Sequence, residues 1–190
     1  VPPLQALLES KPSVESSRFR ARLALRNSGR ILFQVESGGR GEQWIARLDG
    51  SGARKVSGDL NMSYSAYPRA DGREGFTCSH DPAGKAGVYR FDFAGNDAPR
   101  LVLGEEACVN VHPDGSLLAL RMDKTQELRI VEVATGKATT LEPGAATSVR
   151  WSPDGRRLIW GLSGRDDLKV WEPATGKTAR YEGALPYLAF

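Results

Sequence analysis

Two side chains of this chain could act as bases near neutral pH, His80 and His112. His112 precedes a Pro-Asp-Gly signal in the position that Ser152 holds before a second such signal, which favours a turn role over a catalytic one. Ser163 lies in Gly161-Leu162-Ser163-Gly164, which lacks the Gly-x-Ser-x-Gly elbow and the strand-to-helix context that a hydrolase nucleophile needs. These residues predict that the chain is not an enzyme.

Two further patterns suggest a phosphate-binding loop and a cation site, and neither has all the residues that such a site needs. Gly136-Lys137 and Gly176-Lys177 resemble the end of a phosphate-binding loop, but in the second case Trp171 stands where the upstream glycine belongs. Asp166 and Asp167 could help to bind a cation from a loop, although a solvated pair is the favoured alternative. We therefore predict no cofactor and no metal ion.

Arg18, Arg20 and Arg22 form a local basic pattern that alternates with apolar residues, among them Phe19 and Leu23. On a strand, the three guanidinium groups share one face and could grip an acidic partner or phosphates. The favoured alternative is a solvated strand face with Phe19 and Leu23 turned to the core. The chain has 26 basic and 23 acidic residues and no aromatic platform beside the arginines, so nucleic acid is not the expected partner.

Polar turn signals recur along the chain and divide it into repeats of similar length. The first signal occurs four times, at residues 27–29, 70–72, 113–115 and 153–155, and its glycines are 43, 43 and 40 residues apart. The second signal follows each of them, and its glycines, Gly50, Gly95, Gly136 and Gly176, are 45, 41 and 40 residues apart. A period near forty with two turns per unit predicts four short strands per repeat, the spacing of propeller blades.

The flanks of these turns read as strands because β-branched and aromatic residues dominate them. In the fourth repeat, the predicted strands are residues 147–151, 158–160, 168–172 and 179–181. The third repeat has matching stretches in the same four places. Within each first turn we expect Asp to bind its own backbone and Gly to adopt a positive φ.

The segment Val149-Arg150-Trp151-Ser152-Pro153-Asp154-Gly155-Arg156-Arg157-Leu158 resembles the WD40-like repeat of TolB-type propellers. The resemblance covers about residues 21 to 190, and residues 168–177 also resemble the third strand of ordinary WD40 blades. It implies an all-β chain, a β-propeller of about four four-stranded antiparallel blades plus the first strand of another. An unrelated antiparallel sandwich is the alternative.

The repeats divide the chain into three parts. Residues 1–20 are predicted to form a short helix, Pro3 to Lys11, and a lead-in strand, and residues 184–190 read as the first strand of a further blade. Between them lie the four repeats, at about 21–58, 63–103, 107–143 and 147–183. We expect a larger propeller, completed by missing sequence or by another copy of the chain, with a closed four-bladed monomer as the alternative.

Cys78 and Cys108 are the two cysteines, and they do not make a disulfide framework. Cys78 is predicted in the second strand of the second repeat and Cys108 at the start of the third, so adjacent blades could bring them close. Two unpaired, partly buried thiols are the favoured interpretation, which leaves the redox compartment open. No run of eighteen apolar residues predicts a membrane span.

The sequence predicts a non-enzymatic scaffold or binding module that contacts a protein partner through loops on one face. The connections between the second and third strands of each repeat, which we call the B–C connections, differ from one another while the other turns repeat. They fall at about residues 36–42, 79–87, 121–127 and 161–167. The partner-binding candidates are Arg40, His80, Asp81, Asp123 and Asp166, together with Arg18, Arg20 and Arg22.

Two alternatives remain open at this point. The segment could be the substrate-gating propeller of a larger serine hydrolase of the prolyl-oligopeptidase type, or a TolB-like periplasmic envelope protein. The resemblance implies the periplasm or cell envelope, and the cytoplasm stays open as well. The identity of the partner is not encoded in any motif, and self-association is a further expectation.

Overall fold

A computed structural model describes residues 19–25, 29–37, 39–62, 66–69, 71–95, 97–144 and 146–183. These residues belong to two compact units, Val1–Gly104 and Glu105–Phe190. The predicted helix over residues 3–11 and the predicted strand over residues 184–190 lie outside the described residues. Every regular element in the described part is a β-strand, and all paired strands are antiparallel.

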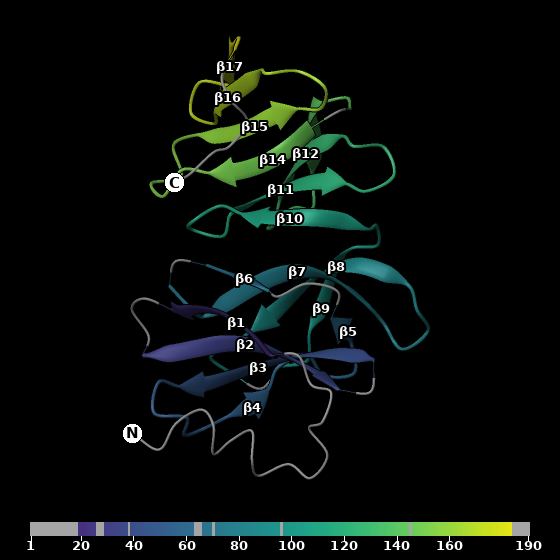
Figure 1. The fold of residues 1–190 in the computed structure, drawn as a ribbon, viewed down its shortest axis with the longest axis vertical. Helices are drawn as coiled ribbons and strands as arrows, with labels where there is room; N and C mark the ends of the chain where they lie inside the picture. The colour runs from purple at the N-terminus through teal and green to yellow at the C-terminus, as the bar shows by residue number, and fades with distance from the viewer. Residues whose placement is uncertain are drawn as a thin grey trace. The chain divides into compact units, whose positions relative to one another are not determined.

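The first unit contains two sheets. The first sheet has the order β1-β2-β3-β4, formed by Phe19–Leu25, Arg30–Ser37, Arg40–Arg47 and Arg54–Lys55 (Figure 1). The second sheet has the order β5-β7-β8-β9, with β6 also paired to β7. Its strands are Asn61–Met62 (β5), Tyr67–Pro68 (β6), Glu74–His80 (β7), Ala86–Asp92 (β8) and Arg100–Leu103 (β9).

The second unit contains two sheets in which sequence order and spatial order agree. The third sheet comprises β10 to β13, which span Ala107–Val111, Leu117–Met122, Leu128–Glu132 and Ala138–Glu142. The fourth sheet comprises β14 to β17, which span Ala146–Trp151, Leu158–Leu162, Leu168–Glu172 and Lys177–Tyr181. Each therefore folds as a meander of three successive hairpins.

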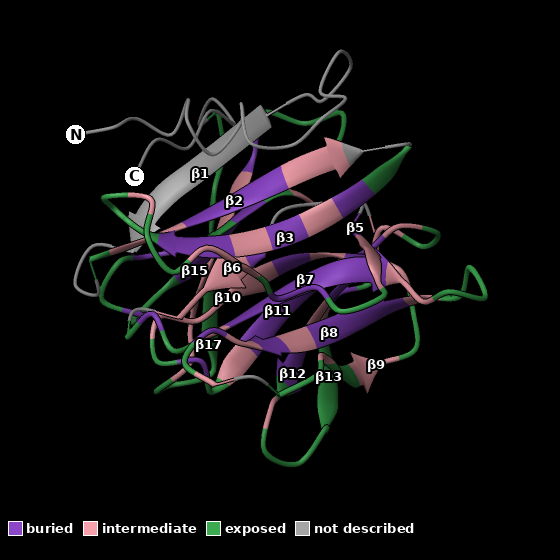
Figure 2. Ribbon diagram, turned by 90° about the horizontal axis from the view of Figure 1, so that it is seen from below, coloured by how far each residue is buried: buried purple, intermediate pink, exposed green. Residues whose placement is uncertain are grey.

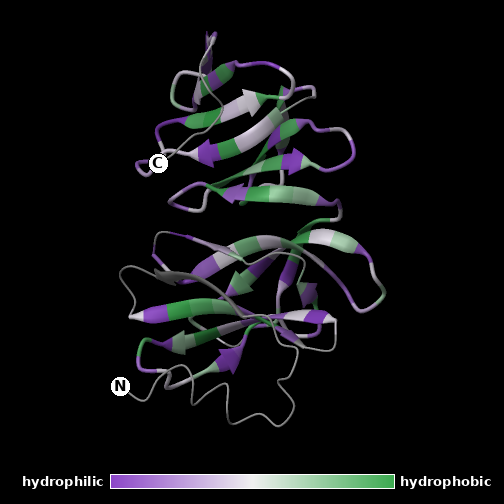
Figure 3. Ribbon diagram, viewed as in Figure 1, coloured by the Kyte–Doolittle hydropathy of each residue, from purple (hydrophilic) through white to green (hydrophobic). Residues whose placement is uncertain are grey.

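Apolar side chains hold the two sheets of each unit together. In the first unit, Leu32 and Ile45 of the first sheet cluster with Phe91 and Phe93 of the second. In the second unit, residues of β11 and β12 cluster with residues of β14 and β15, including the fully buried Trp160. Figure 2 shows the buried stretches along β7 and β8, and Figure 3 shows the hydrophobic stretches along β2 and β11. The sheets of a unit thus pack face to face through their apolar faces.

The first turn of three sheets has one hydrogen-bonding pattern. The glycine amide donates to the carbonyl oxygen three residues earlier at 2.8–3.0 Å, in the pairs Gly72 to Arg69, Gly115 to His112 and Gly155 to Ser152. The aspartate Oδ1 atom accepts from the amide two residues later at 2.8–3.0 Å, in the pairs Asp71 with Arg73, Asp114 with Ser116 and Asp154 with Arg156. The three glycines have φ values of 66°, 75° and 72°. The predicted turn chemistry is confirmed.

Candidate functional site

Arg40 begins β3 directly opposite Ser37, which ends β2. Two residues separate these strands, so the first B–C connection is shorter than the predicted loop over residues 36–42. The turn is short because Gly39 adopts a φ of 76°, which a tight hairpin requires. The Arg40 side chain is exposed, and among the described residues it has no hydrogen-bond or ion-pair partner.

His80 and Asp81 lie where β7 ends. His80 is half-buried and pairs across the sheet with Ala86. Asp81 Oδ1 accepts hydrogen bonds from the amides of Ala83 at 2.9 Å and Lys85 at 2.8 Å. The Asp81 carboxylate therefore shapes the second B–C connection, which limits its freedom to meet a partner.

The three arginines of the basic pattern are only partly described. Arg18 lies outside the described residues, whereas the backbones of Arg20 and Arg22 belong to β1. Arg20 pairs with Gln34 of β2, and the register shifts between Ala21 and Ala24. The shift spans Arg22, and the placement of the three guanidinium groups on one face stays a prediction.

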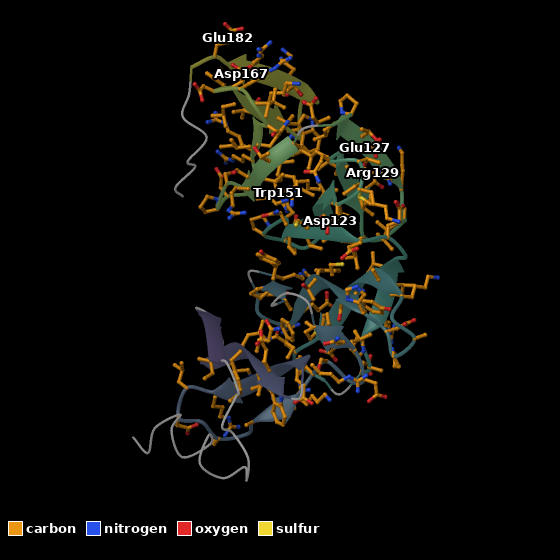
Figure 4. The ribbon with its side chains drawn as sticks, turned by 45° about the vertical axis from the view of Figure 1, so that its right-hand side comes forward. Asp123, Glu127, Arg129, Trp151, Asp167 and Glu182 are labelled. Atoms are coloured by element: carbon orange, nitrogen blue, oxygen red, sulfur yellow. The ribbon has the colours of Figure 1, made fainter. Side chains whose placement is uncertain are left out.

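Asp123 lies in the third B–C connection within a small polar cluster (Figure 4). Its Oδ1 atom is 3.7 Å from Cys108 Sγ and 4.0 Å from the guanidinium of Arg121. Arg121 also donates to Cys108 Sγ at 3.1 Å and to Gln126 Oε1 at 3.0 Å. Cys108 is half-buried and Cys78 is buried, and both are free thiols.

The two neighbouring aspartates of the fourth B–C connection have different environments. Asp166 is exposed, and it has no partner among the described residues. Asp167 is buried, and its Oδ2 atom lies 2.5 Å from the guanidinium of Arg180 on β17. The expectation of a solvated pair is therefore wrong for Asp167, because the pairing of β16 with β17 brings a cation to its carboxylate. No nearby sequence signal identifies Arg180 as its partner.

Sequence reasoning missed a pocket of about 600 Å³ at the opposite end of the strands in the second unit. It is lined by the first turns of the third and fourth sheets and by the turn after β16, including His112, Arg157 and Glu172. Arg157 lies 3.4 Å from Glu172 across this pocket. His112 comes from the third sheet and the other lining residues come from the fourth, so the repeat pattern alone does not specify this pocket.

His112 links two turns at the wall of this pocket. Its Nδ1 atom is 2.6 Å from Asp114 Oδ1, and its Nε2 atom is 3.0 Å from the carbonyl oxygen of Gly155. The imidazole also meets the Trp151 indole edge-on, with 4.7 Å between ring centroids. Burial disfavours the charged form of Asp114, but hydrogen bonds from Ser116 and His112 outweigh it and lower the pKa of Asp114 to about 2. The predicted turn role of His112 is confirmed.

These contacts leave the pocket without a hydrolytic arrangement among the described residues. Both ring nitrogens of His112 face oxygen atoms of the turns. The Ser152 hydroxyl donates to Asp154 Oδ1 at 2.6 Å and accepts from the amide of Arg157 at 2.9 Å. Ser163 is exposed in a different turn. In the same part of the chain, no three His, Cys, Asp or Glu side chains gather as they would around a metal ion.

No protein-family model matches the sequence, and no curated protein matches it. Among solved structures, TolB from Acinetobacter baumannii is similar with a TM-score of 0.64 and 19 % identity, over 81 % of this chain and 40 % of that chain. The β-propeller domain of the Trilobed protease from Pyrococcus furiosus gives a TM-score of 0.66 and 13 % identity, over 87 % and 58 %. A chain of a nidogen/laminin complex is similar with a TM-score of 0.53 and 13 % identity, over 81 % of this chain and 59 % of that chain.

These similarities define the fold. The chain has a TolB-type β-propeller fold, and its antiparallel sheets, three with four strands and one with the additional strand β6, are the blades. It spans about two fifths of TolB and nearly three fifths of each of the other two chains. Within the described residues, no helix has the length and apolar character needed to cross a membrane.

Proposed function

We propose that this chain is a non-enzymatic propeller module that binds another protein through the B–C connections of its blades. The observation that carries the proposal is the contrast between the two kinds of turn. The repeated first turns share one pattern of internal hydrogen bonds, whereas two of the B–C connections present Arg40 and Asp166, which have no side-chain partner among the described residues. Charged side chains that are exposed and unpaired are available to an oppositely charged surface.

The similarity to a chain of a nidogen/laminin complex supports protein binding, because that structure is of a complex. His80, Asp81 and Asp123 belong to the same proposal because each lies at the end of a strand or directly after one. Arg20 and Arg22 extend it along β1, and Arg18 joins them from the sequence pattern. The resemblance to TolB-type repeats adds the periplasm or cell envelope as the proposed location.

Site-specific photo-crosslinking in the native host tests this proposal. A photo-reactive amino acid replaces Asp166 or Arg40, and in the control it replaces Lys137, which is exposed in the turn between β12 and β13. We expect a discrete adduct of one mass from positions 166 and 40. The same adduct at the same yield from position 137 would contradict the proposal.

A second candidate function follows from the similarity to the propeller domain of the Trilobed protease. In this reading, the chain is the substrate-gating propeller of a larger hydrolase whose catalytic domain lies outside these residues. Sequencing the full gene product separates the two candidates, because a downstream Gly-x-Ser-x-Gly segment between a strand and a helix would favour the hydrolase.

A further inference from the structure

Three arginines line a pocket of about 240 Å³ at the end of the first sheet where β2 and β4 begin and β3 ends. They are Arg30 of β2, Arg47 of β3 and Arg54 of β4. Arg30 pairs with Arg47, and Arg54 pairs with Ile45. Because side chains alternate along a strand, all three arginines project from the face that carries the buried Ile45.

Two of these guanidinium groups converge on one oxygen atom of the second sheet. Arg30 donates a hydrogen bond to the carbonyl oxygen of Phe93 at 2.7 Å, and Arg54 donates to the same oxygen at 2.9 Å. Phe93 is fully buried in the core that joins the two sheets. Two like charges are thus held together beside apolar surface, where water screens them less than in bulk solvent.

Two carboxylates interact electrostatically with these cations. The pKa of Asp92 is lowered chiefly by the amide of Gly95 and also by the charge of Arg54, and the pKa of Asp49 is lowered chiefly by hydrogen bonds from Ser51 and also by the charge of Arg47. The nearby Asp92 is engaged by its own turn, since its Oδ1 atom accepts from the amides of Ala94 and Gly95 at 2.8 Å each. The neutral carbonyl of Phe93 orients two guanidinium groups, and the two carboxylates offset the charge of the three arginines only in part. Each guanidinium carries five N–H donors, and Arg30 and Arg54 each use one of them on the carbonyl oxygen of Phe93, so most of the donors remain for another acceptor.

We propose that this pocket binds a phosphate group, held by the guanidinium groups of Arg30, Arg47 and Arg54. The planar guanidinium fork matches a pair of phosphate oxygens, and the doubly negative charge compensates the cations that share one carbonyl. Arg40 and Arg47 lie at opposite ends of β3, so the pocket and the first B–C connection are at opposite ends of the sheet. A failure to bind phosphate would therefore leave the proposed protein binding untouched, and the reverse is also true.

Isothermal titration of the whole chain with inorganic phosphate at constant ionic strength tests the site. We expect saturable binding that Arg47→Ala weakens about tenfold, the loss that one charge-assisted hydrogen bond produces. Arg47 is exposed and makes no bond to Phe93, so the variant leaves the Arg30 and Arg54 contacts in place and should fold. Arg47→Lys keeps the positive charge but lacks the planar guanidinium, so its affinity for phosphate should lie between those of the wild type and of Arg47→Ala. Lys85→Ala removes an exposed charge outside the pocket and should bind like the wild type.

A parallel titration with glycerol phosphate distinguishes the source of the phosphate group. Equal or tighter binding of glycerol phosphate indicates that the pocket takes the phosphate end of a larger molecule, and preference for inorganic phosphate indicates the free ion. Both results support the site. Absence of saturable binding to either compound would overturn it. An equal loss in Arg47→Ala and Lys85→Ala would also overturn it, because general surface charge would then account for the binding.

Discussion

Trp151 ends β14, and its indole is 9 % exposed between the rings of His112 and Trp171. Its Nε1 atom donates to the carbonyl oxygen of Asn110 at 3.3 Å. We predict that Trp151→Ala lowers the free energy of unfolding by about 3–5 kcal/mol, because it removes a large buried ring and leaves a cavity. Arg156→Ala should cost less than about 0.5 kcal/mol, since the Arg156 side chain is 86 % exposed.

Urea denaturation followed by tryptophan fluorescence and circular dichroism measures both variants. The comparison is meaningful if the denaturant slope is unchanged, since a changed slope reports an altered unfolded or native ensemble. Equal midpoints for Trp151→Ala and Arg156→Ala would contradict the buried position of Trp151.

Asp114 gives a prediction about pH. Its folded pKa of about 2 is below the value of about 3.9 expected for an unfolded aspartate, so its ionised form stabilises the fold. This contribution is fully present above about pH 4 and is lost as the pH falls towards 2. We expect the stability difference between the wild type and Asp114→Asn to shrink over that interval, as measured by denaturation at each pH. A difference that stays constant from pH 5 to the acid limit would show that the carboxylate charge is not involved.

At the scale of the elements, the turn between β14 and β15 is coupled to the third sheet through His112. Gly155 and Gly136 have nearly the same φ, 72° and 71°, but a Cβ at Gly155 would lie 2.4 Å from His112 Nε2, whereas a Cβ at Gly136 would meet open space. Gly136→Ala should cost about 1–2 kcal/mol from left-handed backbone strain alone. Gly155→Ala should cost at least about 1–3 kcal/mol more, because the ring is held by Asp114 and Trp151 and cannot easily withdraw.

A double-mutant cycle checks the cause of this extra cost. In the His112→Ala background the obstructing ring is gone, so Gly155→Ala should cost about as much as Gly136→Ala does. An extra cost that persists in that background would mean that His112 is not what the new methyl group meets.

At the scale of the whole molecule, we predict that the isolated chain hydrolyses neither peptides nor esters. The reason is that Ser152 and His112, which line the pocket of the second unit, both form hydrogen bonds that hold the turns. Broad peptidase and esterase substrate panels measure this directly. Turnover that survives purification and disappears in Ser163→Ala would contradict the prediction.

The sequence by itself determined the class of fold and the approximate positions of the strands in the third and fourth repeats. Period-two alternation and Pro-Asp-Gly chemistry act within a few residues, so the hairpin from Trp151 to Leu158 could be read without knowing its surroundings. The same local chemistry predicted the turn role of His112. The strands β5 and β6 of the second sheet were the hardest to predict, because each has only two residues and therefore shows no periodicity.

The tertiary structure decided which side chains meet across strands and sheets. Asp167 finds Arg180 only through the pairing of β16 with β17, and Arg30 and Arg54 reach Phe93 only because two sheets pack face to face. These partners are 13, 63 and 39 residues apart, and no pattern along the chain encodes such separations. Electrostatic and packing contacts act through space, so the pockets at the ends of the strands could be found only after the sheets were placed against each other.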